Sequence, residues 1–317
     1  MISKDINQAA QILTSGGIIG FPTETVYGLA GDIYSEKAIA DIYRIKQRPR
    51  FNPLIVHLKS GADLDTVATD ILQKARELAA AFWPGPLTMV LKKQAHIPDW
   101  ISSGKSTVAV RVPNHPVALS LLQQIDFPLA APSANPFGSI SPTTAAHVED
   151  YFGDQIPMVL DGGACQKGIE STIIGFEGNE PIVYRLGSVS IEEIEAVCGP
   201  IEVRNHNEAA PEAPGMLAKH YSPSTKLILS DDLKLSLETH YGKRIGVLSF
   251  TDVFDAPSIV KLEILSAKAD LAEAASHLYA AMHRLDHAEI DLIIAEKLPD
   301  TGLGKSINDR LKRAATQ

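Results

Sequence analysis

Apolar residues recur along the first 200 positions with the spacing of helices in some stretches and of strands in others. From Ile2 to Leu13 they fall on one face of a predicted helix, and a strand is predicted at 17–22 (GIIGFP). Ser35 is a predicted N-cap for the next helix, which must end before Pro49 because proline interrupts a helix interior. The pattern indicates helices and short strands that follow one another closely.

Residues 107–113 (TVAVRVP) show the clearest strand alternation. The three valines share one face, and Thr107 and Arg111 share the other with Ala109 between them. An arginine that points the same way as a threonine indicates a ligand-facing side of the strand. An edge strand with one solvated face accounts for the same pattern equally well.

Shorter apolar runs predict the remaining elements of this region. Strands are predicted at 53–58, 87–93, 128–131, 158–163, 171–176 and 181–186, and helices at 71–82, 143–151 and 191–197. Some of these strands are too closely spaced for helical crossovers. The prediction is therefore an α/β domain with a mixed sheet over residues 1–200.

The periodicity fails after Gly199, where prolines at 200, 211 and 214 accompany scattered polar residues. This composition predicts a linker at 201–225. Beyond it, four short β segments (KLILS, RIGVLS, KLEILS and DLIIAE) alternate with helical stretches, of which the longest spans about 272–285. Alternation of this kind predicts a small parallel-sheet, Rossmann-like domain at 226–317.

The composition is that of a globular protein with a sizeable core, and it limits the classes of partner. The chain has 317 residues, 45% of them hydrophobic, and a net charge of −9. Both halves are acidic, with 15 basic against 21 acidic residues up to position 200 and 14 against 17 after it. This charge balance argues against a protein whose whole surface binds nucleic acid, so RNA contact would need a local basic patch.

Cysteine content and hydropathy indicate the compartment. The two cysteines are too few and too far apart for a disulfide framework or a zinc knuckle. The first residues, MISKDINQAAQ, lack the apolar core of a signal peptide, and no run approaches the ~20 apolar residues that span a bilayer. We therefore expect a cytoplasmic protein without a membrane association.

A basic cluster precedes the strand that begins at Pro53. Arg44, Lys46, Arg48 and Arg50 lie within seven residues, at the end of a predicted helix. Arginine binds phosphate or carboxylate with two parallel hydrogen bonds, so this junction is a candidate anion site. A solvated helix end, where basic residues suit the helix dipole, explains the cluster as well.

Two motifs in the last third resemble functional sites without completing them. Gly304-Lys305-Ser306 matches the end of a phosphate-binding loop, but the position that requires the first glycine is Pro299, so helix capping is the better interpretation. His283 and His287 have the spacing of a helical metal pair. They lack a third ligand, which favours surface histidines.

An ordered set of motifs is more specific than any of these features alone. PTETVYGL, KxR followed by NPLIVH, STVAVRVP, APSAN, SPTT, IESTII and YRLG occur in this order and together closely resemble the threonylcarbamoyl-AMP synthase family, the YrdC-like proteins. The segment PGMLAKHYSP and the tail GLGKSINDRLKRAA resemble the two-domain members, so the resemblance extends over essentially the whole chain.

This resemblance implies a YrdC-like mixed-sheet domain and a defined reaction. Such proteins make L-threonylcarbamoyladenylate and pyrophosphate from L-threonine, bicarbonate and ATP, as the first step of threonylcarbamoyladenosine formation in tRNA. A downstream tRNA threonylcarbamoyl-transferase machinery is the implied partner, and the sequence leaves monomer and homodimer both open. Magnesium bound through the ATP phosphates is the expected cofactor, with no metal ligands assigned to the protein.

The resemblance also assigns residues to the two substrates, with Lys46 and Arg48 at the reacting centre. The ATP site is expected to contain Lys46, Arg48, Asn52, Thr107, Ser133, Asn135, Ser141, Arg185 and Tyr221. The threonine site is expected to contain Thr25, His57, Arg111, Ala131 and Ser171, with Arg111 holding the amino-acid carboxylate.

Two other functions fit parts of the sequence. A non-catalytic module that binds double-stranded RNA or tRNA would use the basic cluster at 44–50, although the acidic total of both halves argues against this as the main role. Carbamoyl-transfer enzymes of hydrogenase maturation contain a related domain, but those chains are far longer and carry zinc-finger cysteines that are missing here.

The linker has a predicted mechanical role. Tyr221 near its end is expected to close over the nucleotide as part of a lid that excludes water from a product prone to hydrolysis. An ordinary tether with an incidental tyrosine is the alternative. Leu217-Ala218 stand where family members often carry an aromatic or basic residue, which bears on how tightly such a lid seals.

Overall fold

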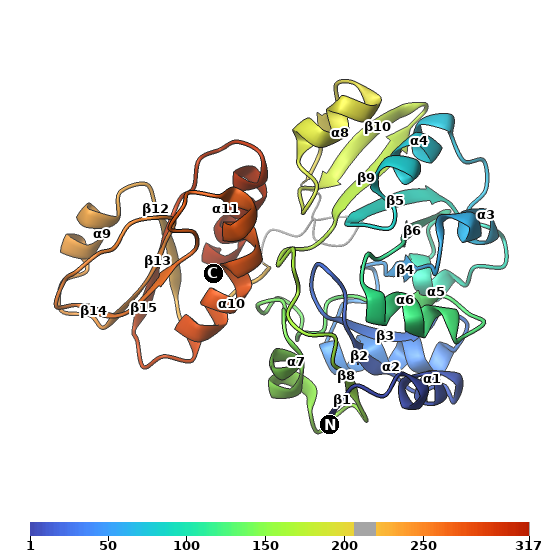
Figure 1. Cartoon of the computed structure of the whole chain (residues 1–317), viewed down its shortest axis with the longest axis horizontal. Coiled ribbons are helices and arrows are strands. Elements are labelled where there is room, and N and C mark those ends of the chain that lie inside the picture. Colours follow the sequence, from blue (N-terminus) through green and yellow to red (C-terminus); the bar gives the residue numbers. More distant parts are fainter. Residues whose placement is uncertain (206–219, 317) are drawn as a thin grey trace.

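The computed structural model describes residues 1–205 and 220–316, and they form two layered α/β domains (Figure 1). The first is built on an eleven-stranded sheet with the order β1-β8-β2-β3-β7-β4-β6-β5-β9-β10-β11. Its strands are β1 (Ile2–Ser3), β2 (Ile19–Phe21), β3 (Gly28–Asp32), β4 (Ile55–His57), β5 (Leu87–Lys92), β6 (Thr107–Arg111), β7 (Leu129–Ala130), β8 (Val159–Leu160), β9 (Thr172–Glu177), β10 (Glu180–Arg185) and β11 (Glu202–Val203).

Parallel and antiparallel neighbours alternate irregularly in this sheet, so the predicted mixed sheet is confirmed. β4 and β6 are parallel, whereas β5 and β6 are antiparallel. β6 therefore lies inside the sheet, and the interpretation of residues 107–113 as an edge strand is wrong. Because β4 and β6 run in the same direction, His57 and Arg111 are register partners at their carboxyl ends.

Helices cover both faces of this sheet. They are α1 (Ile6–Thr14), α2 (Glu36–Lys46), α3 (Leu64–Val67), α4 (Gln73–Phe82), α5 (Asp99–Ser102), α6 (Pro116–Gln123), α7 (Ala145–Phe152) and α8 (Ile191–Cys198), with a 3₁₀ turn at Gly61–Asp63. Leu129 of β7 packs in the core beneath α1 and α6, whereas the next residue, Ala130, packs in the main core with α2, α4, α7 and α8. Successive strand residues point to opposite faces, so the sheet separates these two cores.

Local sequence explains where the first helices begin. Ser35 caps α2 as predicted, because its hydroxyl accepts a hydrogen bond from the Ala38 backbone N–H. The first helix begins later than predicted, since Ile2 lies in β1 and Asp5 supplies the N-cap of α1. β1 pairs with β8, a strand more than 150 residues away, and that pairing overrides the local helical pattern.

The second domain has the predicted parallel sheet. Its four strands, in the order β12-β15-β13-β14, are β12 (Leu227–Ser230), β13 (Ile245–Ser249), β14 (Ile259–Ile264) and β15 (Leu292–Glu296). Every neighbouring pair is parallel. The helices are α9 (Leu233–Thr239), α10 (Leu271–Asp286) and α11 (Leu303–Ala315). Within the described ranges, no helix is long and apolar enough to cross a bilayer.

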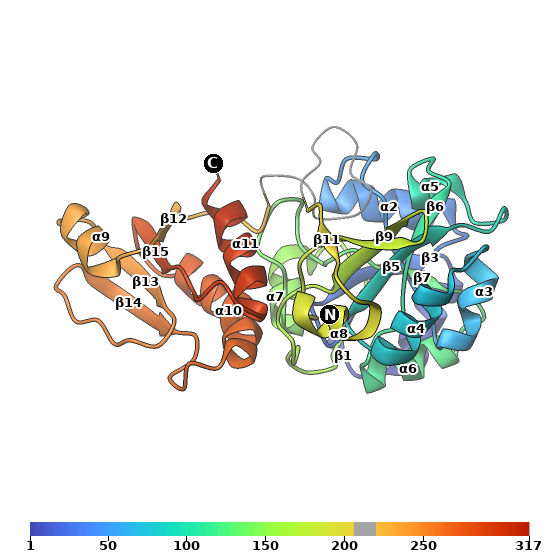
Figure 2. The same ribbon diagram turned by 90° about the horizontal axis from the view of Figure 1, so that it is seen from above.

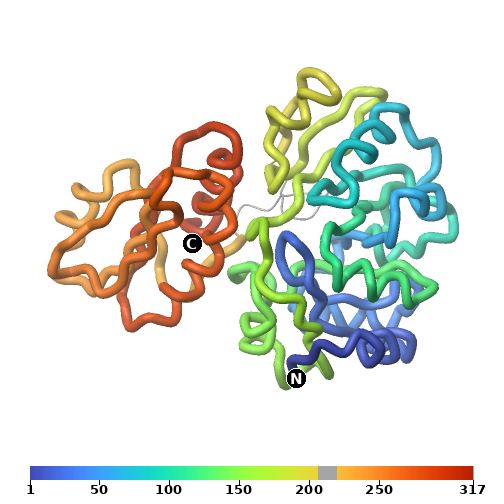
Figure 3. The backbone as a smooth tube through the Cα atoms, viewed as in Figure 1, coloured from blue at the N-terminus to red at the C-terminus, as the bar shows by residue number. Residues whose placement is uncertain are grey.

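Helices α10 and α11 lie between the second sheet and the first domain (Figures 1 and 2). The core beneath them is shared, since Val26, Ile140 and Ile169 of the first domain belong to the same buried cluster as Leu278 and Leu311. The backbone trace shows two lobes joined at this side (Figure 3). The first sheet ends with β11, inside the range predicted as linker, and residues 206–219 of that linker lie outside the described residues.

Candidate active site

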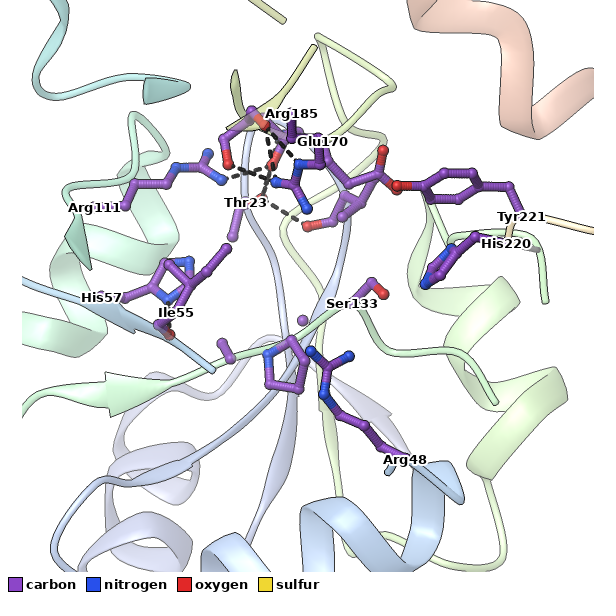
Figure 4. A pocket seen from close by; sticks show the side chains of 16 residues that line it. Thr23, Arg48, Ile55, His57, Arg111, Ser133, Glu170, Arg185, His220 and Tyr221 are labelled. Atoms are coloured by element: carbon purple, nitrogen blue, oxygen red, sulfur yellow. Dashed lines mark hydrogen bonds between the residues drawn. The ribbon is translucent and has the colours of Figure 1, made fainter. Parts of the chain in front are cut away.

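A cavity opens near the middle of the first domain, where strand ends and the loops that follow them meet (Figure 4). It holds about 590 Å³ of space, including its open mouth. All five residues predicted at threonine line it, namely Thr25, His57, Arg111, Ala131 and Ser171. Four of those predicted at ATP line it as well: Arg48, Ser133, Arg185 and Tyr221.

Arg111 reaches the cavity from the end of β6 and is held there by three contacts. Its Nε donates to the Gly85 carbonyl oxygen (3.3 Å), Nη1 donates to the Thr25 hydroxyl (2.9 Å), and Nη2 lies 2.6 Å from Glu24 Oε1 in an ion pair. Arg111 and Glu24 are 4% and 5% exposed as side chains, so this pair is buried. The guanidinium has more N–H donors than these contacts use, which leaves it able to bind a further anion.

His57 lies beside Arg111 on the neighbouring strand, and it is neutral. Burial, together with the charge of Arg111, lowers the pKa of His57 to about 3. Its Nδ1 lies 3.2 Å from the Ile55 carbonyl oxygen, so Nδ1 carries the proton and donates to that oxygen. His57 can thus contribute a fixed neutral wall to the cavity, but it is unsuited to carry positive charge there.

The basic cluster at 44–50 divides between the cavity and the surface. Arg48 is buried in the cavity wall, while Arg44 and Arg50 are exposed, and Arg44 pairs with Asp41. Lys46 is buried at the end of α2. Of these four basic residues only Arg48 lines the cavity, and for it the anion site stays a prediction. The solvated-end interpretation fits the exposed Arg44 and Arg50.

Arg48 is fixed by the loop that follows it. Its Nη2 donates to Asn52 Oδ1 (2.6 Å) and to the Pro53 carbonyl oxygen (2.9 Å). Burial lowers the pKa of Arg48 to about 10, with a further lowering from Arg185 across the cavity, and it remains a cation at neutral pH. Asn52 does not line the cavity, and in this structure it orients Arg48 instead.

Lys46 lies behind the cavity wall. Its Nζ donates to the carbonyl oxygens of Ser133 (2.5 Å) and Asn135 (2.6 Å), which fixes the loop after β7. Burial and the charge of Arg48 lower the pKa of Lys46 well below its usual value. An anion bound at Ser133 would raise this pKa again, since opposite charge favours the protonated form.

Three further residues predicted at ATP stand away from the cavity lining. Asn135 turns its amide toward the Pro136 and Ser139 carbonyl oxygens, and Ser141 donates its hydroxyl to Glu170. Thr107 begins β6, at the opposite end of the strand from Arg111. Their roles toward ATP stay predictions, and for Thr107 the structure offers no direct approach to this cavity.

Glu170 lines the cavity and was not among the predicted residues, although it directly precedes Ser171 in the motif IESTII. Burial by itself raises its pKa, but the charges of Arg310 and Arg185 and the hydrogen bond from Ser141 outweigh this and lower the pKa of Glu170 to about 2. It is therefore ionised. The sequence signal that could have found it is an acidic residue immediately before a buried strand.

Tyr221 and His220 close one side of the cavity (Figure 4). Tyr221 is 1% exposed and adopts a left-handed backbone conformation with φ of 64°. His220 packs edge-on against Phe137 with ring centroids 5.8 Å apart, and burial lowers its pKa to about 3. The end of the linker thus contributes to the wall, while the departure at Leu217-Ala218 falls outside the described residues.

The two incomplete motifs of the last third have structural roles. Lys305 pairs with Glu192 of α8 (2.7 Å), and the Ser306 hydroxyl donates to the Gly187 carbonyl oxygen (2.9 Å), so this motif joins the two domains. His283 is buried and stacks on His147 of α7 with centroids 3.9 Å apart, so its assignment as a surface histidine is wrong. Across residues 1–205 and 220–316, no three His, Cys, Asp or Glu side chains are grouped to hold a metal ion.

Gly187 lets two cavity segments pack closely. A Cβ there would lie 2.4 Å from the carbonyl carbon of Ser171 and 2.5 Å from the Glu170 carbonyl oxygen. We expect Gly187→Ala to lower the free energy of unfolding by about 3 kcal/mol, because overpacking forces backbone shifts. Urea denaturation measures this, with Gly61→Ala as the control, since a Cβ at Gly61 meets only Trp83 at 3.9 Å. Equal stability of both variants would contradict the prediction.

Two family models match consecutive parts of the chain. The model described as Telomere recombination (Sua5, YciO, YrdC) matches residues 11–187, which is more than half of the chain. The model described as threonylcarbamoyl-AMP synthase, C-terminal domain, matches residues 189–316.

Curated relatives match over nearly the full length. A threonylcarbamoyl-AMP synthase of Pyrococcus abyssi is 37% identical over 324 residues, which cover 98% of this chain and 94% of the relative. A threonylcarbamoyl-AMP synthase of Bacillus subtilis is 39% identical over 321 residues, covering 98% and 92%. The crystal structure of P. abyssi Sua5 complexed with L-threonine superposes with a TM-score of 0.91 at 37% identity, covering 98% of this chain and 94% of that one.

Proposed function

Since the chain belongs to the threonylcarbamoyl-AMP synthase family, we propose that it makes L-threonylcarbamoyladenylate from L-threonine, bicarbonate or CO2, and ATP. In this reaction the threonine amine takes up CO2 to form a carbamate. A carbamate oxygen then attacks the α-phosphorus of ATP, the bond to the β-phosphate oxygen breaks, and pyrophosphate leaves. The reaction is a nucleotidyl transfer, and its product is the activated intermediate of tRNA threonylcarbamoyladenosine modification.

The observation that carries this proposal is the division of charge within one cavity. Arg111 and His57 lie toward one end, and Arg48 lies on a different wall from them (Figure 4). Threonine brings a carboxylate and ATP brings a polyphosphate, so the reactants need separate cationic contacts close to each other. Holding the two reactants in line supplies much of the rate enhancement without a protein nucleophile.

At the threonine end, Arg111 would bind the carboxylate with the N–H groups that Gly85, Thr25 and Glu24 leave unused. Glu24 then acts as a fixed counter-charge that keeps the guanidinium in place. At the nucleotide end, Arg48 and Arg185 would face the phosphates. Burial lowers the pKa of both arginines, so binding a polyanion there relieves unfavourable charge.

In this proposal, magnesium binds to the protein together with ATP, through the ATP phosphates. Asn135 lies outside the cavity lining, but its buried Oδ1 has no hydrogen-bond partner among the described residues, and an amide oxygen is a ligand type that suits a hard cation. One amide oxygen without grouped carboxylates fits an ion held mainly by phosphate oxygens. Magnesium would neutralise charge on the leaving pyrophosphate.

The test is the dependence of pyrophosphate release on the other two substrates. We expect the purified chain to convert ATP to pyrophosphate only when threonine and bicarbonate are both present. Mass spectrometry with isotopically labelled threonine should then find the label in an adenylate product. Pyrophosphate release that is indifferent to threonine would overturn the proposal.

The RNA-binding alternative is not favoured. Within the cluster at 44–50, Lys46 and Arg48 are buried and Arg44 pairs with Asp41, which leaves little charge for an RNA backbone. Transfer of the product to tRNA by a separate machinery remains part of the proposal, and it requires no extended basic surface on this chain.

A further inference from the structure

Glu170 is a carboxylate in the wall of a cavity proposed to bind anions. Its Oε1 accepts hydrogen bonds from the Ser141 hydroxyl (2.6 Å) and the Tyr279 hydroxyl (3.1 Å). Its Oε2 accepts from Tyr279 (3.0 Å) and from Arg310 Nε (3.0 Å). Unless its charge is cancelled, a buried carboxylate at this place would repel phosphate strongly, because buried charges are poorly screened. The cation that bonds it directly, Arg310, comes from the second domain.

Arg310 projects from α11 and is completely buried. Besides Glu170, it contacts Asp309 through Nη1 (2.9 Å) and the Leu186 carbonyl oxygen through Nη2 (2.6 Å). Its guanidinium carbon lies 5.0 Å from the centroid of the Tyr221 ring. A single side chain of the second domain therefore holds both the carboxylate and the aromatic ring that line one end of the cavity.

We propose that Arg310 is a positioning residue for the nucleotide end of the active site: it cancels the charge of Glu170 and fixes Glu170 and Tyr221 where the phosphates of ATP must pass. This inference rests on the proposed function. The second domain then completes the electrostatics of the cavity, in addition to packing against the first domain.

The neighbours of Glu170 determine what removal of Arg310 does. The titratable and charged side chains that face it from the surrounding elements are Arg310 of α11, Tyr279 of α10, Arg185 of β10, and His220 and Tyr221. Asp309 of α11 pairs with Arg310. Without Arg310, Arg185 still lowers the pKa of Glu170 by its charge, and its Nε and Nη2 donate to Ser171. In a variant that lacks Arg310, burial therefore raises the pKa of Glu170 toward the pH range of the assay.

The experiment is a double-mutant cycle read out in ATP-dependent pyrophosphate formation. We expect Arg310→Met to lower kcat/KM for ATP about 100-fold, because it leaves a buried charge uncompensated. Glu170→Gln in the Arg310→Met background should restore activity to within about 10-fold of wild type. If the losses of activity in the single variants Arg310→Met and Glu170→Gln simply add in the double variant, the inference is overturned.

The pH profile separates an electrostatic role from a purely structural one. As pH falls from 8 to 6, protonation of Glu170 in Arg310→Met should raise its activity relative to wild type, whereas the double variant should keep a constant ratio. The ratio to wild type cancels the pH dependence of bicarbonate itself. If the ratio of Arg310→Met activity to wild-type activity does not change with pH, the proposal is contradicted.

Lys305→Met is the matched control on the same helix. It breaks the exposed ion pair with Glu192 between the domains without touching the cavity, and it should leave activity and pH profile unchanged. Losses like those of Arg310→Met would mean that any weakening of the interface inactivates the enzyme, and would overturn the proposal.

If Arg310→Met does not fold, Tyr279→Phe replaces it in the cycle. This change removes one donor to both carboxylate oxygens but keeps the ring beside Tyr221, with centroids 5.8 Å apart. We expect KM for ATP to rise about 10-fold in Tyr279→Phe and to change little when Glu170→Gln is already present. Additive changes contradict the inference. Failure of wild type to make the product contradicts the proposed function instead.

Discussion

Arg111→Met should abolish most of the use of threonine, lowering kcat/KM for threonine by roughly 10²–10³-fold. The guanidinium lies at the cavity end of β6, held by Gly85, Thr25 and Glu24, and the proposal gives it the substrate carboxylate. Methionine keeps the apolar stem and removes every donor. Threonine titrations of pyrophosphate release at saturating ATP and bicarbonate measure the effect.

The same substitution also leaves a buried carboxylate without its ion-pair partner, so an effect on protein stability must be distinguished from an effect on threonine binding. Glu24 loses its ion-pair partner in Arg111→Met, and the free energy of unfolding should fall by about 3 kcal/mol. The double variant Glu24→Gln with Arg111→Met is the control, because it removes the stranded charge. It should regain stability in urea denaturation without regaining activity. Recovery of both would show that Arg111 acts only by supporting the fold.

Arg48→Met should lower kcat by roughly 10²–10³-fold, because Arg48 lines the cavity and the proposal places its guanidinium against the phosphates whose charge changes as pyrophosphate leaves. Steady-state pyrophosphate assays at saturating concentrations of all substrates measure this kcat directly. KM for threonine should change much less, since Arg48 lies away from the end of the cavity occupied by Arg111 (Figure 4).

Arg50→Met is the matched control for Arg48. Arg50 belongs to the same basic cluster, two residues further on, but its side chain is exposed. It should retain nearly full activity if the buried cation matters and the cluster as a whole does not. Similar losses in both variants would indicate that the surface charge of this segment, rather than the cavity, supports turnover.

Local patterns predicted much of the fold because they depend on neighbours in sequence. The N-cap at Ser35 and the alternation at 107–113 are set by hydrogen bonding and side-chain direction within a few residues. The parallel sheet of the second domain followed from its alternation of strands and helices. The helix predicted to begin at Ile2 begins later in the structure, because Ile2 lies in β1 and pairs with β8, a strand that is distant in the sequence.

Within the candidate site, the ordered motifs contain one residue of each important contact, but they did not identify its partner. Arg111 was predicted from its strand face, but its partner Glu24 stood only within the motif PTETVYGL, with no role assigned to it. Glu170 and Arg310 are 140 residues apart and come from different domains. In α11, Asn308 and Arg310 are polar yet almost fully buried, and helical periodicity assigns no partner to such residues.

The sequence by itself determined the family, the two sheet-centred domains and most of the residue types that line the candidate cavity, because motif order, hydrophobic spacing and charge are properties of the chain read locally. Tertiary structure alone decided which charges are buried and paired. It placed Lys46 behind the wall, Arg48 and Arg111 in it, and Glu170 against Arg310. Burial and pairing depend on distances between segments remote in sequence, and these distances set the strength of every electrostatic contact in the site.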